Sequence, residues 1–356
     1  MAQLVIEGGR PLAGTISLAG AKNSSFKLMI ASLLAAGETC LTNLSQIDEV
    51  RHVSFMLQAL GARVRPSAGR GLTIDTHSVK AAAIPEELGR FSRASTLFLG
   101  PLLARFGRAV VPLPGGDAIG KRPLERHWEG LSSLGVQLEV KDKLIEARVA
   151  NLHGGHYRFA KNSHTGTETL IMAAVLAKGR TMIDNAAQEP EVDDLINFLN
   201  QMGAKITRSG RMIAIEGVKI LQPAVYSVMP DRNQAVSYAI AALATGGELT
   251  INNARAEHMT AFLTKLKQAG AGVETDVTGI RFFFKQTLKA TAITTEPHPG
   301  FMTDWEPLWS VLMTQAQGGS KIIEAVFIDR WQFVPDLIAM GARISYFDPK
   351  PNHPDR

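Results

Sequence analysis

The sequence predicts an α/β fold made of repeated layered modules that group into lobes. Its 356 residues are 45% hydrophobic, so the chain can bury a large core and is long enough for two domains. Apolar helices alternate with short strands along the whole length, and the same order recurs at intervals of 67 to 74 residues. This period is too long for the common solenoid repeats and is typical of small modules in which helices pack on a sheet.

Each module is marked by a glycine that ends its second helix before a strand. The five segments that carry this glycine are Leu-Gly-Ala-Arg-Val (60–64), Leu-Gly-Val-Gln-Leu (134–138), Met-Gly-Ala-Lys-Ile (202–206), Ala-Gly-Ala-Gly-Val (269–273) and Met-Gly-Ala-Arg-Ile (340–344). Upstream, a strand ends in a polar turn, as in Cys40-Leu-Thr-Asn-Leu, Met182-Ile-Asp-Asn-Ala and Leu249-Thr-Ile-Asn-Asn. Apolar stretches predict the first helices at 24–36, 94–105, 167–177, 233–244 and 305–315.

Composition argues against several classes of function. A net charge of +5 without a dense basic stripe, together with 6% aromatic residues, suits an anionic small molecule better than a nucleic acid. No apolar run reaches the roughly 18 residues that span a bilayer, and the first residues lack a signal-peptide pattern, so we expect a cytoplasmic protein. The single cysteine, Cys40, excludes an internal disulfide and a cysteine-based zinc site. We expect it at a buried strand position.

Charged or hydrogen-bonding residues precede or begin the first helix of each module. They are Lys22-Asn23, Arg93, Ser163-His164-Thr165, Asp231-Arg232 and Thr303-Asp304. Free amide donors and the positive end of the helix dipole suit phosphate and carboxylate ligands at such a place. Helix capping is the alternative for Ser163, Thr165 and Thr303, but it does not account for the cationic residues.

The segment Val111-Pro-Leu-Pro-Gly-Gly-Asp-Ala-Ile-Gly-Lys-Arg-Pro123 has the composition of a mobile catalytic loop. Its glycines relax the backbone while its prolines fix the ends, so such a loop can close over a ligand. Asp117 stands five residues before Arg122, whose guanidinium can bind a phosphate or a carboxylate through two hydrogen bonds. A hairpin turn with a solvated Asp117 is the alternative.

With these features the chain closely resembles the enolpyruvyl transferases, and within them the branch that acts on UDP-N-acetylglucosamine. The motifs that carry the resemblance are Gly20-Ala-Lys-Asn-Ser24, Arg93-Ala-Ser95, Pro114-Gly-Gly-Asp-Ala-Ile-Gly-Lys-Arg-Pro123, Asp184-Asn-Ala-Ala-Gln-Glu-Pro-Glu191, Pro230-Asp-Arg232, Pro299-Gly-Phe-Met-Thr-Asp304 and Phe327-Ile-Asp-Arg330. The resemblance implies an inside-out α/β barrel of two lobes, each of three modules, with the active site in the cleft. Residues 1–21 and 230–356 would form the C-terminal lobe, and residues 22–229 the N-terminal lobe with the catalytic loop 111–123.

Two features depart from the family pattern. The loop of the family usually carries cysteine where this chain has Asp117. The chain also shows five complete modules where the family has six, so we expect a fragment in which the sixth module is largely missing. The missing part would supply an arginine that helps hold phosphoenolpyruvate, and the fragment as given can therefore lack activity.

The implied reaction moves the enolpyruvyl group of phosphoenolpyruvate to the 3-hydroxyl of UDP-N-acetylglucosamine and releases phosphate, the first committed step of peptidoglycan precursor synthesis. No metal or organic cofactor is needed, and the two small molecules are the only partners implied. Residues that match the family's substrate contacts are Lys22, Asn23, Arg93, Arg122, Pro123, Leu124, Glu125, Arg126, Lys161, Asn162, Ser163, His164, Asp304 and Val326, with Asp231 and Arg330 in supporting positions. Arg126 and His164 stand where the family often has aliphatic side chains.

The resemblance assigns four catalytic residues. Lys22 and Arg122 would hold phosphoenolpyruvate, Asp304 would take the proton of the sugar hydroxyl, and Asp117 would protonate the methylene carbon. Free aspartate is almost fully ionised at pH 7, so this role requires the pKa of Asp117 to be raised well above its ordinary value. Loop closure beside two anionic substrates favours that rise, and Arg122 opposes it. Fosfomycin inhibits cysteine-bearing members by reacting with the loop thiolate, so we expect this chain to resist it.

Other readings of the sequence remain open. The sister family that acts on shikimate 3-phosphate shares the repeat, although the loop and the Asn-Ala-Ala-Gln-Glu-Pro segment favour the nucleotide-sugar branch. A non-catalytic paralogue would bind UDP-N-acetylglucosamine and release no phosphate even when the missing C-terminal segment is restored. Nucleic-acid binding is a weaker third reading, and a steep fall of affinity with salt would reveal it.

Overall fold

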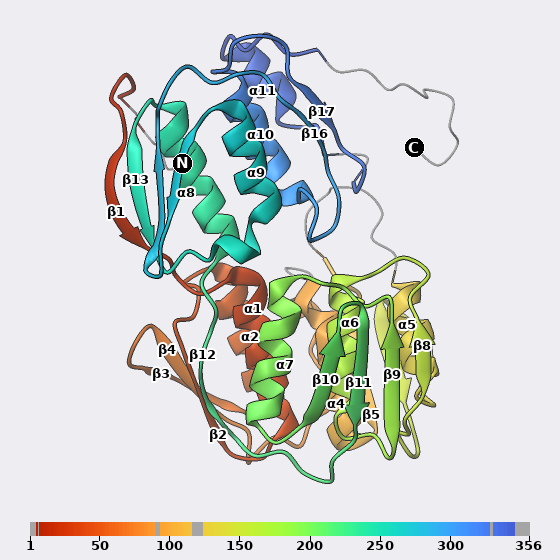
Figure 1. Ribbon diagram of the computed structural model, residues 1–356. Helices are drawn as coiled ribbons and strands as arrows, with labels where there is room; N and C mark the ends of the chain where they lie inside the picture. The colour runs from red at the N-terminus through yellow and green to blue at the C-terminus, as the bar shows by residue number, and fades with distance from the viewer. Residues whose placement is uncertain (1–4, 6, 90–92, 116–123, 328–329, 346–356) are drawn as a thin grey trace. The chain divides into compact units, whose positions relative to one another are not determined.

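The computed structural model describes all residues except 1–4, 6, 90–92, 116–123, 328–329 and 346–356. The chain folds into two compact units (Figure 1). The N-terminal unit comprises the described residues from Ala19 to Met229, and the C-terminal unit comprises those up to Leu18 and from Pro230 onward. Each unit has its own hydrophobic core.

The N-terminal unit contains three modules, each with a small sheet. The strand orders are β12-β2-β4-β3, β5-β7-β6 and β8-β9-β11-β10. The strands are β2 (Glu38–Thr42), β3 (Arg63–Ser67), β4 (Gly71–Asp75), β5 (Arg108–Pro112), β6 (Gln137–Lys141), β7 (Leu144–Arg148), β8 (His156–Arg158), β9 (Arg180–Asp184), β10 (Lys205–Ser209), β11 (Met212–Glu216) and β12 (Val225–Ser227). The helices are α1 (Lys22–Ala31), α2 (Asp48–Ala59), α3 (Glu86–Gly89), α4 (Leu99–Phe106), α5 (Glu125–Ser132), α6 (His164–Ala174) and α7 (Pro190–Gln201), with short 3₁₀ helices η1 (Ser32–Leu34) and η2 (Arg93–Phe98).

The first helices of the three modules lie in the interior of this unit. Every residue from Ser24 to Ala31 in α1 and from Gly166 to Ala174 in α6 is buried. A helix without an exposed face must be enclosed by other elements, and Figure 1 shows sheets on the outside of the unit with helices between them. The arrangement is therefore α/β with helices inside, and its described strands form separate sheets rather than a closed barrel.

The C-terminal unit has a four-stranded sheet of order β1-β13-β15-β14 and a parallel pair, β16-β17. Its elements are β1 (Ala13–Ser17), α8 (Arg232–Ala244), β13 (Glu248–Asn252), η3 (Ala256–His258), α9 (Thr260–Ala269), β14 (Gly272–Thr275), β15 (Gly279–Phe283), β16 (Ala292–Thr294), η4 (Thr303–Trp305), α10 (Glu306–Met313), β17 (Lys321–Ile323) and α11 (Val334–Ala339). β1 pairs in parallel with β13, which joins the start of the chain to this sheet. Trp305 and Trp309 each pack on Phe262 and Phe301, with ring centroids 5.4 to 6.1 Å apart.

The predicted repeat is confirmed by the backbone. The glycines that follow the second helices have left-handed φ angles of 100°, 89°, 101°, 90° and 99° at Gly61, Gly135, Gly203, Gly270 and Gly341. Asparagines after β2, β9 and β13 also adopt φ angles of 54°, 51° and 64°, at Asn43, Asn185 and Asn253. Glycine and asparagine are the residues that enter this region most readily. The polar turns that recur in the sequence are therefore the same turn built in three modules.

Two local predictions are wrong. Residues 342–345 follow Gly341 without forming a strand, because no described strand lies beside them to complete a ladder. Cys40 does lie on a strand, β2, but it is only half-buried, since Thr39 and Leu41 on either side occupy the inner face.

No described helix combines the length and the apolar character that a bilayer crossing requires.

Asp194 on α7 joins several parts of the N-terminal unit. Its carboxylate accepts hydrogen bonds from the Ser24 hydroxyl on α1, from the Tyr226 hydroxyl at 2.7 Å and from the Met229 N–H at 3.3 Å. Burial raises the pKa of Asp194, and these three hydrogen bonds oppose the rise. The Ala21 N–H donates to the Met229 carbonyl at 2.7 Å, so the two ends of the unit lie together.

Candidate active site

Ten of the predicted site residues are described in the N-terminal unit, at or near the starts of its helices. They are Lys22, Asn23, Arg93, Leu124, Glu125, Arg126, Lys161, Asn162, Ser163 and His164. Lys22 and Asn23 open α1, which has no side-chain cap. The half-exposed Lys22 ammonium lies 2.7 Å from the Glu49 carboxylate on α2. A cation thus stands at the positive end of a helix dipole, a place that suits an anionic ligand.

The start of α6 combines a cap with two residues that do not cap. Ser163 caps the helix as predicted, since its Oγ accepts from the Gly166 N–H at 3.2 Å. The predicted cap at Thr165 is wrong, because this residue lies within the helix, where its hydroxyl contacts His127 Nε2 at 3.0 Å. His164, the first helical residue, is half-buried and reaches Lys27 of α1. These contacts join α1, α5 and α6 in one region.

His127 on α5 is a buried residue that the sequence reasoning missed. Burial, together with the positive charges of Arg93 and Arg126, lowers its pKa to about 4. A neutral imidazole therefore lies between the start of α5, the start of α6 and Arg93 of η2. Contacts of His127 and His164 thus link α1, α5 and α6, and Arg93 and Arg126 lie close enough for their charges to act on His127.

In the C-terminal unit, Asp304 lies in η4 and does not cap a helix. Its Oδ1 accepts from Arg330 at 3.0 Å, and the Asp304 side chain is 40% exposed while that of Arg330 is 16% exposed. Arg330 also donates to the Thr303 hydroxyl at 3.1 Å, and that hydroxyl donates to Glu324 at 2.9 Å. The predicted cap at Thr303 is therefore wrong. The arrangement leaves the Asp304 carboxylate, oriented by a guanidinium, at an accessible position.

Glu324 orders the segment that contains Val326. Its Oε1 accepts from the Val326 N–H at 2.7 Å and from the Phe327 N–H at 2.8 Å. Through Glu324 and Thr303, the predicted nucleotide contact Val326 is therefore connected to Asp304. No sequence signal pointed to Glu324.

Asp231 and Arg232 stabilise the start of α8 and the packing around it. Asp231 caps α8 by accepting from the Asn233 N–H at 2.7 Å and the Gln234 N–H at 3.1 Å. Arg232 is buried, with Nη1 3.1 Å from His298 Nδ1 and its guanidinium over the Trp305 ring. Trp305 immediately follows Asp304, so this packing supports the η4 segment.

Glu306, two residues after Asp304, is fully buried and was also missed. Its Oε1 accepts from the Ser310 hydroxyl at 2.9 Å, and no described residue bonds its Oε2. Burial raises the pKa of Glu306 to about 7; the Ser310 hydrogen bond opposes the rise and the nearby Glu324 carboxylate adds to it. A carboxyl group that is half neutral near physiological pH therefore lies beside the Asp304 network.

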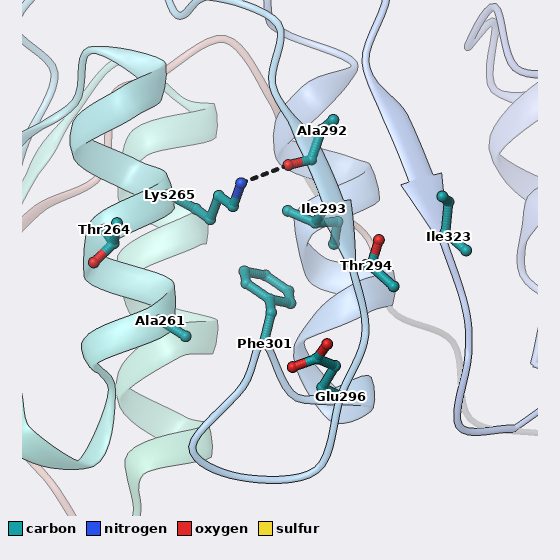
Figure 2. Close-up of a pocket in the computed structure, with 9 residues that line it drawn as sticks. All are labelled: Ala261, Thr264, Lys265, Ala292, Ile293, Thr294, Glu296, Phe301 and Ile323. Atoms are coloured by element: carbon teal, nitrogen blue, oxygen red, sulfur yellow. Dashed lines mark hydrogen bonds between the residues drawn. The ribbon is translucent and has the colours of Figure 1, made fainter.

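The remaining predicted residues, Asp117, Arg122 and Pro123, lie outside the described residues. In the part of the chain that the structure describes, no group of three His, Cys, Asp or Glu residues could hold a metal ion. A pocket of about 450 Å³ lies between α9 and β16, where Figure 2 shows Lys265 reaching the Ala292 carbonyl at 2.8 Å. None of the predicted site residues lines it.

Comparison with known proteins gives the family. The model of the EPSP synthase (3-phosphoshikimate 1-carboxyvinyltransferase) family matches residues 6–353. The chain is 42% identical to the UDP-N-acetylglucosamine 1-carboxyvinyltransferase of Desulfosudis oleivorans over 97% of its own length and 83% of that protein. It belongs to the enolpyruvyl transferase family.

Other relatives agree with this placement. The UDP-N-acetylglucosamine 1-carboxyvinyltransferase of Sorangium cellulosum is 42% identical over 97% of this chain and 82% of its own. The enolpyruvyl transferase NikO from Streptomyces tendae has the same fold, with a TM-score of 0.86 at 22% identity over 96% of this chain and 82% of that one. The protein is therefore an enzyme that transfers a carboxyvinyl group. The fold that its family resemblance implied is the fold of its structural relatives.

Proposed function

We propose that this enolpyruvyl transferase joins phosphoenolpyruvate to the 3-hydroxyl of UDP-N-acetylglucosamine. The observation that supports this choice of acceptor is the 40 to 42% identity, over 97% of the chain, to proteins named for that reaction. The proposal implies a cytoplasmic enzyme of peptidoglycan precursor synthesis, because both substrates are soluble cytoplasmic metabolites.

Asp304 is the proposed general base. It is the carboxylate that the Arg330 guanidinium orients at 3.0 Å while leaving the side chain 40% exposed. An ionised, accessible carboxylate can accept the proton of the sugar hydroxyl as that oxygen bonds to the central carbon of phosphoenolpyruvate. Arg330 is then a positioning residue for this step.

Asp117 is the proposed general acid, and Lys22, Arg93 and Arg122 are the proposed anion contacts. Asp117 would add a proton to the methylene carbon, which makes the central carbon electrophilic. Loss of a proton from the resulting methyl group, with departure of phosphate, would then restore the double bond. Cations near the departing phosphate stabilise the charge that develops there. Asn23, Leu124 to Arg126, Lys161 to His164 and Val326 are proposed to bind the nucleotide sugar.

The test follows phosphate release and product mass with both substrates present. We expect phosphate and an enolpyruvyl nucleotide sugar in equal amounts, and neither with shikimate 3-phosphate as the acceptor. Turnover with shikimate 3-phosphate instead would overturn the proposed acceptor. Calorimetric binding of UDP-N-acetylglucosamine without any turnover, also after the expected sixth module is added to the chain, would support a non-catalytic binding protein.

A further inference from the structure

A buried ion pair in the N-terminal unit has no part in the function described so far. Lys27 of α1 places its Nζ 2.8 Å from Oε1 and 2.7 Å from Oε2 of Glu168 on α6. The two side chains are 3% and 0% exposed. Burying an ion pair loses the hydration of both charges, and an apolar pair of similar size is often as stable. Stability alone does not account for the pair, and its neighbours indicate a specific role.

The pair contacts His164, the first residue of α6. Lys27 Nζ lies 2.9 Å from His164 Nε2, and Glu168 Oε1 lies 3.2 Å from the same nitrogen. An ammonium group has three protons and no lone pair. At 2.9 Å the Nε2 atom must accept one of those protons, because a proton on Nε2 would point at another donor. Glu168 Oε1 accepts a second proton at 2.8 Å, and Oε2, 2.7 Å from Nζ, completes the ion pair.

This geometry fixes the tautomer of the neutral ring. With Nε2 accepting, the single ring proton is on Nδ1. The His164 side chain is 22% exposed, and among the described residues its hydrogen-bond and ion-pair partners are all at Nε2. The Nδ1–H group is therefore available as a donor at the start of α6, where backbone amides already favour an acceptor ligand.

The charges around the ring do not change this conclusion. Burial lowers the pKa of His164, Glu168 raises it, Lys27 lowers it and Glu189 before α7 raises it, with a net rise. His127 on α5 lies close by, since the charge of Glu168 also raises the pKa of His127, and His127 contacts Thr165. An imidazolium carries protons on both nitrogens, so Nδ1 remains a donor whether His164 is neutral or charged.

We propose that Lys27 and Glu168 are positioning residues that hold His164 in the Nδ1–H form and so make it a permanent hydrogen-bond donor to an oxygen of the nucleotide sugar. The identity of the ligand rests on the proposed function. The assignment of the tautomer does not rest on the proposed function, because it follows from contacts within this unit.

The first test is a nitrogen-15 NMR spectrum of the histidine-labelled chain without ligand. Replacement of His164 by glutamine assigns its ring signals. At a pH where the ring is neutral, we expect the shift pattern of the Nδ1–H tautomer, which is the minor form of free histidine in water. The Nε2–H pattern would overturn the proposal, whatever the enzyme binds.

The second test uses Lys27→Met and calorimetry with UDP-N-acetylglucosamine at two pH values, one below and one above the pKa of its His164 ring. The histidine spectrum of the variant measures that pKa, which the loss of Lys27 raises. Without the ammonium, the neutral His164 ring carries its proton on Nε2 and donates it to Glu168, and Nδ1 is left without a proton. We expect the affinity of the variant to fall about tenfold from the lower to the higher pH, the size of one hydrogen bond to an ionic acceptor, while the parent changes less than threefold over the same range. A structural role alone would weaken binding equally at both pH values, and that result would refute the proposal.

Two controls complete the design. Adding His164→Ala to Lys27→Met should abolish the pH dependence, and persistence of the dependence would refute the role of His164. If Lys27→Met does not fold, Lys27→Met/Glu168→Met removes both buried charges, and its histidine spectrum should shift toward the Nε2–H form. An unchanged Nδ1–H form in that variant would show that the pair does not set the tautomer. If the parent binds no nucleotide sugar, the proposed function fails while the spectrum still decides the tautomer.

Discussion

Replacing Glu306 by glutamine should stabilise the C-terminal unit, and the gain should depend on pH. Glu306 is fully buried in the first turn of α10, and burial raises its pKa from 4.5 to about 7. Below pH 4.5 the carboxyl group is neutral in both the folded and the unfolded chain. Between pH 4.5 and 7 it stays neutral when folded but ionises when unfolded, so the folded state loses stability as the pH rises. Above pH 7 it is ionised in both states and the penalty is constant.

The size of the effect follows from the difference in pKa. Each pKa unit corresponds to about 1.4 kcal/mol, so a rise from 4.5 to about 7 destabilises the folded state by about 3 kcal/mol at pH 8. Glutamine keeps the shape of the side chain and cannot ionise. Its amide also buries two N–H donors, and the loss of their hydration opposes the gain, so about 3 kcal/mol is an upper bound. The expected gain is below about 1 kcal/mol at pH 5.

Urea unfolding followed by tryptophan fluorescence measures this gain. Trp305 and Trp309 belong to the core of the same unit, and a Trp128→Phe background removes the indole of the N-terminal unit. Glu257→Gln, at an exposed position in η3, is the matched control and should change stability equally little at pH 5 and 8. A stability difference between Glu306→Gln and its parent that is the same at both pH values would refute the reasoning.

Three further predictions concern other carboxylates. Asp304→Asn should reduce turnover at least a thousandfold while the calorimetric affinity for UDP-N-acetylglucosamine stays within about tenfold, because the amide keeps the shape but cannot accept a proton; turnover within a few-fold of the parent would remove Asp304 from the role of base. The parent should resist fosfomycin and Asp117→Cys should be active and inactivated by it over time, because a thiolate opens the epoxide far faster than a carboxylate does; time-dependent inactivation of the parent, or full activity of Asp117→Ala, would contradict the loop assignment. Asp194→Ala should cost about 2 to 4 kcal/mol in urea unfolding because it removes the acceptor of three hydrogen bonds, two of them buried. Asp193→Ala, next to it with a side chain 52% exposed, should cost less than about 1 kcal/mol. Equal losses would show that the Asp194 hydrogen bonds do not stabilise the N-terminal unit.

The repeat could be predicted from the sequence because it depends on local backbone chemistry. A glycine after a helix and an asparagine after a strand each specify a left-handed residue, and both signals recur in several modules with the expected φ angles. Capping was harder to predict, since a hydroxyl at a helix start has several partners within reach. Ser163 caps α6, while Thr165 bonds His127 and Thr303 bonds Glu324. Local sequence identifies the hydroxyl but not its partner.

The strand predicted after Gly341 is missing because no described strand pairs with it. Its sequence has the alternation of the other four, yet a strand is defined by hydrogen bonds to a neighbour, and none is described beside residues 342–345. The roles of the predicted substrate residues stay predictions. Those of Asp117 and Arg122 depend on a segment outside the described residues, and the others depend on bound ligands.

The buried charges explain why sequence reasoning finds candidate site residues more readily than the buried residues around them. Asp304 and His164 stand at helix starts, where a charged or polar side chain in an otherwise apolar pattern suggests a ligand. Lys27, Glu168 and Glu306 lie inside or beside those same helices, where each alone is an interruption of an apolar face. Lys27 and Glu168 are 141 positions apart, and their relation becomes visible only when α1 and α6 pack together. Because the cost of burying each charge depends on its partner, such residues should change together among relatives, so a relative without the lysine should also lack the glutamate.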